Sequence, residues 1–184
     1  MDEIKEMKCC FIGHRTIDDA QKTYKRLVRE LSSIVVTLPL RTFLFGSRSD
    51  FNDMCHAVVT ELKDTYPDIK RIMYSCKSEC ACLESERERT NQIFSKLLKK
   101  QVEFQGYEED YKFPKYLTAG RASYVERNKA MIEDSDICIF YLNEEYTQKN
   151  TRSGTAIAYD YAVKLSKKQN GKPRIINIFS ETNE

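Results

Sequence analysis

Two short segments, each joining an expected strand to an expected helix, carry a glycine followed two positions later by an arginine. They are Gly13-His14-Arg15 and Gly46-Ser47-Arg48, and the second continues into Ser49-Asp50. Glycine permits a sharp turn and the close approach of a ligand, while arginine offers a two-pronged donor to phosphate or carboxylate. Because both segments end equivalent strands, they predict one shared anion site.

A third segment, Arg152-Ser153-Gly154-Thr155, opens a helix expected to run to residue 168. The N–H groups and the positive dipole end of a helix N-terminus attract anions, and the hydroxyls of Ser153 and Thr155 add hydrogen-bonding groups. Apolar residues cover nearly the whole circumference of this helix, so we expect it to be largely buried with its first turn at the sheet edge. An ordinary capped helix is the alternative interpretation.

A fourth segment begins at Arg121 and places residues of two kinds on opposite faces of a helix. One face is apolar and is expected to be core: Ala122, Val125 and Ile132. The other face carries Met131 and three groups that suit a nucleobase and its phosphate, namely an aromatic ring, a guanidinium and an amide: Tyr124, Arg127 and Asn128. A solvated charged face is the alternative.

The remaining reactive residue types form no self-sufficient catalytic constellation. His14 lies within the first site segment and could contact a ligand, whereas His56 lies on an expected helix as a boundary residue. Cys76, Cys80 and Cys82 have C-x3-C-x-C spacing, which invites a metal hypothesis but lacks the paired C-x2-C spacing of structural zinc sites. Since Cys9, Cys10 and Cys138 fall in expected strands, we interpret the seven cysteines as reduced, small hydrophobic residues. No metal and no cofactor is expected.

Short apolar runs alternate with segments of helical period, which is typical of an α/β protein. The expected strands cover residues 8–12, 42–45, 71–74, 102–104, 136–142 and 174–179, and the expected helices cover 18–36, 50–66, 83–100, 122–133 and 155–168. Several strands are continuously apolar, so the sheet should be mostly parallel with helices on both faces. Residues 105–120 are too long for an ordinary connection, and they predict either a functional lid or a polar loop. In such a sheet, ligands bind beyond the carboxyl ends of the strands.

Composition favours one globular domain spanning residues 1–184, with a core of about 8–179. The chain is 41% hydrophobic and 32% charged with only six Gly and four Pro, which excludes disordered and low-complexity classes. Thirty Lys and Arg against 28 Asp and Glu give a net charge of +2, which does not indicate a nucleic-acid or membrane surface. No secretory signal is visible, and the apolar run 137–142 is far shorter than the ~20 residues that span a bilayer. We therefore expect a cytoplasmic protein.

Five segments together resemble the SMF/DprA–LOG (SLOG) superfamily of Rossmann-like nucleotide-binding proteins, in particular its single-domain members. They are Cys10-Phe11-Ile12-Gly13-His14-Arg15, Phe45-Gly46-Ser47-Arg48-Ser49-Asp50, Arg127-Asn128-Lys129-Ala130-Met131, Ser135-Asp136-Ile137-Cys138-Ile139-Phe140-Tyr141 and Ser153-Gly154-Thr155. The resemblance implies a Rossmann-like three-layer sandwich, a nucleotide pocket at the strand carboxyl ends and a homodimer or higher homo-oligomer. Some relatives sense ADP-ribose-type signals in anti-phage defence, others bind DNA, and others are cytokinin-activating phosphoribohydrolases.

The sequence departs from the hydrolase branch of that superfamily at a decisive position. The resemblance places Ala158 where the catalytic glutamate of the Gly-Gly-x-Gly-Thr-x-x-Glu motif would stand. A methyl group cannot accept a proton, and Asp160 lies roughly 200° further round the helix, so it cannot simply substitute. Binding without hydrolysis is therefore favoured.

The sequence thus predicts capture of a nucleotide or of a nucleotide-derived signal, of ADP-ribose or cyclic-nucleotide type, by a sensor, carrier or sequestering protein. The expected ligand-binding residues are Gly13, His14, Arg15, Gly46, Ser47, Arg48, Asp50, Arg121, Tyr124, Arg127, Asn128, Ser153, Gly154 and Thr155. The alternative is a nucleoside 5′-monophosphate phosphoribohydrolase that uses a rearranged carboxylate such as Glu126 or Asp160. Binding of single-stranded DNA fits less well, because no basic stripe with interleaved aromatic residues is evident.

Overall fold

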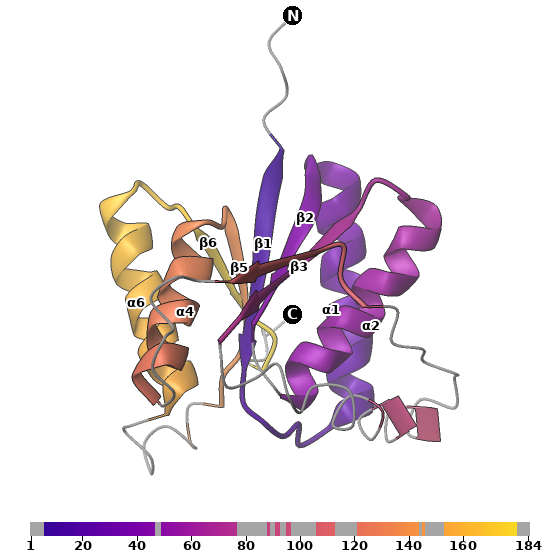
Figure 1. The fold of residues 1–184 in the computed structure, drawn as a ribbon, viewed down its shortest axis with the longest axis horizontal. Helices are drawn as coiled ribbons and strands as arrows, with labels where there is room; N and C mark the ends of the chain where they lie inside the picture. Colours follow the sequence, from indigo (N-terminus) through magenta and orange to yellow (C-terminus); the bar gives the residue numbers. More distant parts are fainter. Residues whose placement is uncertain are drawn as a thin grey trace, which may run out of the picture.

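A six-stranded parallel sheet in the order β4-β3-β2-β1-β5-β6 forms the centre of the protein (Figure 1). The computed structural model describes residues 6–46, 49–76, 106–112, 121–143 and 153–179, together with 88, 91–92, 95–96 and 145. The strands are β1 Met7–Gly13, β2 Leu40–Phe45, β3 Lys70–Ser75, β4 Glu109–Lys112, β5 Ile137–Tyr141 and β6 Arg174–Asn177. β1 and β5 lie side by side at the centre of the sheet, which explains their continuously apolar sequences.

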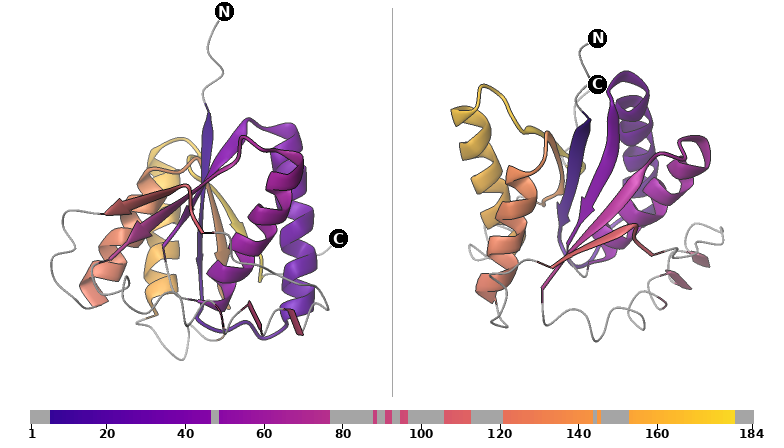
Figure 2. Two further views of the ribbon diagram at one scale, coloured as in Figure 1. Left: turned by 45° about the vertical axis from the view of Figure 1, so that its right-hand side comes forward. Right: turned by 45° about the horizontal axis from the view of Figure 1, so that its top comes forward.

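Two pairs of helices cover the two faces of this sheet (Figures 1 and 2). Helices α1 (Ala20–Thr37) and α2 (Asp50–Thr65) lie on one face, and α4 (Arg121–Glu133) and α6 (Gly154–Lys168) lie on the other. Side-chain oxygens cap three of them, since Asp19, Ser49 and Ser153 accept hydrogen bonds from the backbone N–H three residues further on. The expected three-layer α/β sandwich with a mostly parallel sheet is confirmed.

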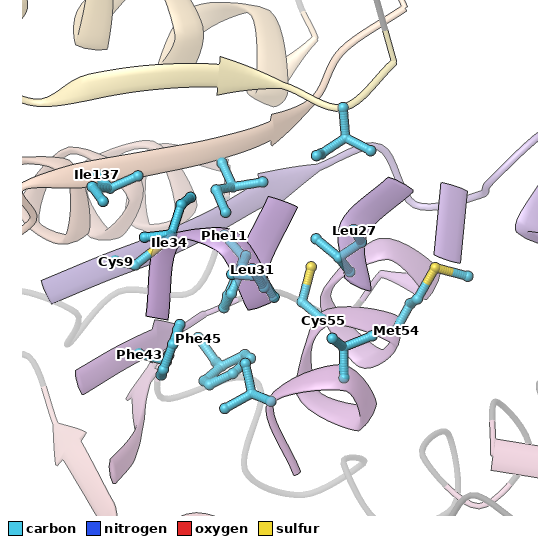
Figure 3. Packing of buried hydrophobic residues seen from close by; sticks show 14 of the residues in the cluster. Cys9, Phe11, Leu27, Leu31, Ile34, Phe43, Phe45, Met54, Cys55 and Ile137 are labelled. Carbon is cyan, nitrogen blue, oxygen red and sulfur yellow. The ribbon is translucent and has the colours of Figure 1, made fainter. Parts of the chain in front are cut away.

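Each face of the sheet has its own hydrophobic core. The core under α1 and α2 is built around Phe11, Leu31 and Phe43, with the Phe11 and Phe43 rings stacked 5.9 Å apart (Figure 3). The core under α4 and α6 is built around Cys10, Cys138 and Phe140. The five cysteines among the described residues are buried free thiols, and burial raises the pKa of Cys9 and Cys55 well above the usual value. In the described part of the chain, no helix is long and apolar enough to cross a membrane.

The edge strand β4 corrects the expectation for residues 105–120. We expected a lid or polar loop, but Glu109–Lys112 pair in parallel with β3. The Arg71 side chain binds the Glu108 carboxylate just before this strand, and the Tyr111 ring lies 4.8 Å from the Tyr74 ring. An edge strand is commonly charged, which hides it from a search for apolar runs. The expected strand 102–104 and most of the expected helix 83–100 lie outside the described residues.

Candidate ligand site at the carboxyl edge of the sheet

The order of the strands places a topological switch point between β1 and β5. From β1 the chain adds β2, β3 and β4 on one side, and it then returns to add β5 and β6 on the other. Where strand order reverses in this way, the connections leave the two strand ends in opposite directions, and ligands bind outside the carboxyl ends. His14 and Arg15 follow β1, and Asn143 follows β5, so these residues lie at the switch point.

A hydrogen bond from Asn143 to His14 joins the segments that follow β5 and β1 at this switch point. The backbone N–H of Asn143 donates to Nε2 of His14 over 3.1 Å, and the backbone N–H of His14 donates to the Tyr141 carbonyl over 3.3 Å. Burial lowers the pKa of His14, against the opposite influence of the Asp18 carboxylate. Because Nε2 accepts, the ring is neutral and carries its proton on Nδ1 in this arrangement.

Arg127 places a buried guanidinium over the ends of β2 and β3. Arg127 is only 1% exposed, and its Nη1 lies 3.9 Å from the sulfur of Cys76, which follows β3. Its Nη2 donates to Oδ1 of Asn128 over 3.3 Å, and its Cζ lies 5.3 Å from the centre of the Tyr124 ring. The three groups expected to face a ligand on α4 are therefore brought together. Taking a guanidinium out of water is costly, which makes this cluster a candidate for function.

The burial of α4 corrects our expectation about its faces. The face carrying Arg127, Asn128 and Met131 is buried against the sheet and is not a solvated charged face. Ala122 is exposed and Val125 is half-buried, so the expected apolar face is core only at Ile132. Nε and Nη2 of Arg127 donate to Oδ1 of Asn128 over 3.4 and 3.3 Å, which helps these polar side chains to occupy the buried face.

Gly13 and Gly46 bring helices close to the sheet. A Cβ atom at Gly46 would lie 2.9 Å from Nε of Arg127 and would also overlap Met131. A Cβ atom at Gly13 would lie 2.7 Å from Cγ of Phe51, which is on the first turn of α2. Protein side chains thus take the space in which we expected a ligand to approach the glycine backbone. The glycines position the site by letting α2 and α4 pack tightly.

The start of α2 is fixed against the loop that follows β1. The backbone N–H of Asp50 donates to the Arg15 carbonyl over 2.8 Å, while the Arg15 side chain is exposed to solvent. This bond brings two of the sequence-predicted segments together at the carboxyl edge. Ser47, Arg48 and the side chain of Arg121 lie outside the described residues.

The first turn of α6 has the features of an ordinary capped helix. Ser153 accepts from the N–H of Ala156 over 3.5 Å, Gly154 is exposed and Thr155 is buried. The expectation that α6 is buried nearly all round is wrong, because its fully buried residues form one stripe: Thr155, Ala158 and Ala162. Helix α6 packs on α4 and the β5–β6 side of the sheet and leaves its outer face to solvent. Ala158 lies in the core under α4 and α6.

The carboxylates that a hydrolase would need lie on the surface. Glu126 is exposed and pairs with Lys129 over 3.1 Å, and Asp160 is exposed on α6. Within the described residues, no group of three or more His, Cys, Asp and Glu side chains could hold a metal ion. Cys80 and Cys82 of the cysteine motif lie outside those residues.

Sequence reasoning missed Asn52 on the first turn of α2. Asn52 is only 1% exposed, although asparagine is normally a surface residue. Its one sequence signal is the spacing of four residues to His56, which puts both polar side chains on one side of the helix. That signal predicts a shared face, but it does not show that the face is buried.

No protein-family model and no curated protein matches the sequence. Among solved structures, the fold is similar to DNA processing protein A from Helicobacter pylori, whose structure was described for its single-stranded DNA binding mode. The TM-score is 0.52 at 15% identity, covering 97% of this chain and 67% of that chain. A likeness at this identity shows the fold alone. The chain therefore has a Rossmann-like fold similar to that of DNA processing protein A, while its membership of the SLOG superfamily stays a prediction.

Proposed function

We propose that this protein binds a nucleotide or nucleotide-derived ligand at the carboxyl edge of its sheet, and acts as a sensor, carrier or sequestering protein. The buried guanidinium of Arg127, held beside Gly46 and Asn128 over the end of β2, carries this proposal. A guanidinium has five N–H donors and no acceptor, so it suits an anionic ligand such as a phosphate ester.

We assign the predicted residues to different parts of the ligand. In this proposal, Arg15, Arg48 and the first turn of α6 hold phosphate groups, because they offer cations and helix N–H groups. Tyr124, Arg127 and Asn128 face the ribose and base, with Arg127 also pairing with the adjoining phosphate. The contact of 5.3 Å between the Arg127 guanidinium and the Tyr124 ring supports this division, since it presents a planar stacking surface beside a charge.

Native mass spectrometry of protein purified directly from cells, followed by calorimetric titration, tests the proposal. We expect either a retained small molecule of nucleotide mass or measurable heat with at least one of AMP, ADP and ADP-ribose. A clean protein mass together with no heat and no thermal shift for any of these ligands would exclude nucleotide binding.

Single-stranded DNA is a second candidate ligand, and the likeness to DNA processing protein A favours it. The net charge of +2 argues against an extended phosphate-tracking surface. Fluorescence anisotropy with a labelled 20-nucleotide oligothymidine at two salt concentrations distinguishes the candidates. Binding that weakens steeply with salt would indicate a strand, whereas binding of mononucleotides alone would indicate a pocket.

A further inference from the structure

The side chain of Asn52 contains a buried hydrogen-bond acceptor that the fold does not use. Asn52 is 1% exposed, and its backbone N–H donates to the capping hydroxyl of Ser49 over 3.1 Å. Its side-chain Oδ1 is buried and accepts no hydrogen bond from any residue that the structure describes. An unsatisfied buried acceptor costs a folded protein free energy, so its presence in a tightly packed turn requires an explanation.

The surroundings of Asn52 place it at the carboxyl end of β2. Helix α2 is the next element after β2 in the chain, and the bond between Asp50 and the Arg15 carbonyl holds its first turn at the sheet edge. One helical turn further on, the ring of His56 lies 5.4 Å from that of Phe45, the last residue of β2. Asn52 shares that side of α2 and lies nearer to the start of the helix, and therefore nearer to the carboxyl edge.

Arg127 lies by the same strand end on the opposite face of the sheet. Its Nε would be 2.9 Å from a Cβ atom at Gly46, the residue that directly follows β2. A ligand over the end of β2 would therefore have a guanidinium on the α4 face and an amide oxygen on the α2 face. The two groups differ in what they require, because a guanidinium needs an acceptor and Oδ1 needs a donor.

We propose, on the basis of the nucleotide-binding function above, that Asn52 recognises the nucleoside part of the ligand by accepting a hydrogen bond from a ribose hydroxyl or a base amino group. A fully ionised phosphate has oxygens but no donor, so it matches Arg127 and leaves Oδ1 of Asn52 unsatisfied. Asn52 thus makes the site selective for a nucleoside phosphate over inorganic phosphate.

Replacement of Asn52 by leucine, which has a similar size and no polar atoms, separates this role from a structural one. We expect Asn52→Leu to melt at the wild-type temperature or above, because the substitution removes an unsatisfied acceptor. We also expect its affinity for AMP to fall by about tenfold or more, the equivalent of one lost hydrogen bond. Its affinity for inorganic phosphate should stay within about twofold of wild type, since Arg127 is untouched.

Asn177→Leu is the matched control. The Asn177 amide accepts from the N–H of Leu142 and donates to the Leu142 carbonyl, each over 3.0 Å. The same substitution there removes satisfied bonds, and its melting temperature should fall by several degrees. If leucine does not fit at position 52, Asn52→Ala repeats the comparison without a branched side chain.

The outcomes separate the two claims. Wild-type AMP affinity in a folded Asn52→Leu variant, or a melting temperature that falls as far as in Asn177→Leu, overturns the role of Asn52 and leaves nucleotide binding standing. Equal losses of AMP and phosphate affinity also overturn it. Wild-type protein that binds none of AMP, ADP, ADP-ribose and inorganic phosphate overturns the proposed function itself.

Discussion

Gly46 and Arg127 are in such close contact that a single methyl group at position 46 would reach the guanidinium. A Cβ atom there would lie 2.9 Å from Nε and 3.1 Å from Cδ of Arg127. Gly46 follows β2 directly, and Arg127 comes from the middle of α4. The glycine therefore determines how deeply this arginine is buried at the carboxyl edge of the sheet.

We expect Gly46→Ala to impair ligand binding more than folding. The atoms that the new methyl group meets belong to the flexible side chains of Arg127 and Met131, which can move aside at a cost of about 1 kcal/mol. The displaced guanidinium should weaken AMP binding by roughly tenfold, the loss of one charge-assisted hydrogen bond. Calorimetric titration alongside thermal melting measures both effects. Unchanged AMP affinity would contradict the position assigned to Arg127.

Gly13→Ala should impair folding more than ligand binding. Its Cβ atom would lie 2.7 Å from Cγ and 2.9 Å from Cβ of Phe51, and the Cβ of Phe51 cannot move without moving α2. Overpacking of this kind should lower the free energy of unfolding by about 3 kcal/mol, or the melting temperature by about 6–12 °C. Urea denaturation of both variants in parallel checks that Gly13→Ala is less stable than Gly46→Ala. Equal stability of the two would show that α2 adapts as easily as a side chain.

The burial of His14 predicts a dependence of stability on pH. Burial lowers the pKa of His14 from its usual 6.5, so the unfolded chain binds a proton more readily than the folded protein. The stabilising contribution is therefore present above pH 6.5 and is lost as the pH falls below that value. His14→Gln retains an acceptor but does not titrate, so its melting temperature should vary less between pH 7.5 and pH 5, about the range of histidine titration. If the melting temperatures of wild type and His14→Gln changed with pH by the same amount, His14 would not contribute to the pH dependence of stability.

Glu108 predicts a second pH effect in a more acidic range. Burial alone would raise the pKa of Glu108, but hydrogen bonds from Arg71 and Lys63 lower it to about 2, against a usual value of 4.5. Because the folded-state pKa is depressed, the stability that Glu108 contributes is present above pH 4.5 and is lost as the pH falls toward 2.

Glu108→Gln should flatten this acidic loss of stability and should also destabilise the protein at pH 7, by about 1–3 kcal/mol, because it leaves the buried Arg71 without its carboxylate. Denaturant titrations at several pH values measure both effects. Glu109→Gln, one residue further on, is the matched control and should follow the wild-type profile. If the stability of Glu108→Gln depended on pH as that of wild type does, the acidic loss of stability could not be assigned to Glu108.

Much of the fold was predictable because burial on both faces leaves a simple pattern. β1 and β5 are continuously apolar, and α1 and α2 have helical periodicity, so the limits of these elements were predicted to within about two residues. β4 was missed because an edge strand with the sequence Glu-Asp-Tyr-Lys has no apolar run. Its position depends on Arg71 and Tyr74, which are about 35 residues earlier in the chain and cannot be paired with it by local pattern.

The sequence predicted which segments lie at the carboxyl edge of the sheet, but not how their side chains pack. The segments at Gly13 and Gly46 do meet at the carboxyl edge, as parallel topology requires, but their glycines accommodate Phe51 and Arg127 rather than open space. The buried face of α4 was assigned wrongly because Arg127 donates to Asn128 within that face, which residue types alone do not reveal. Asn52 was missed because only atomic positions show that its Oδ1 is buried.

The most direct test of the proposed function compares Arg127→Met with wild type in calorimetric titrations with AMP, ADP and ADP-ribose. Lys129→Met is the matched control, because it removes one positive charge two residues further along α4 from a partly exposed position. We predict that wild type and Lys129→Met bind the same nucleotide with affinities within about threefold, and that Arg127→Met binds it at least about 30-fold more weakly while remaining folded. Equal binding by all three proteins would contradict a ligand site built around Arg127.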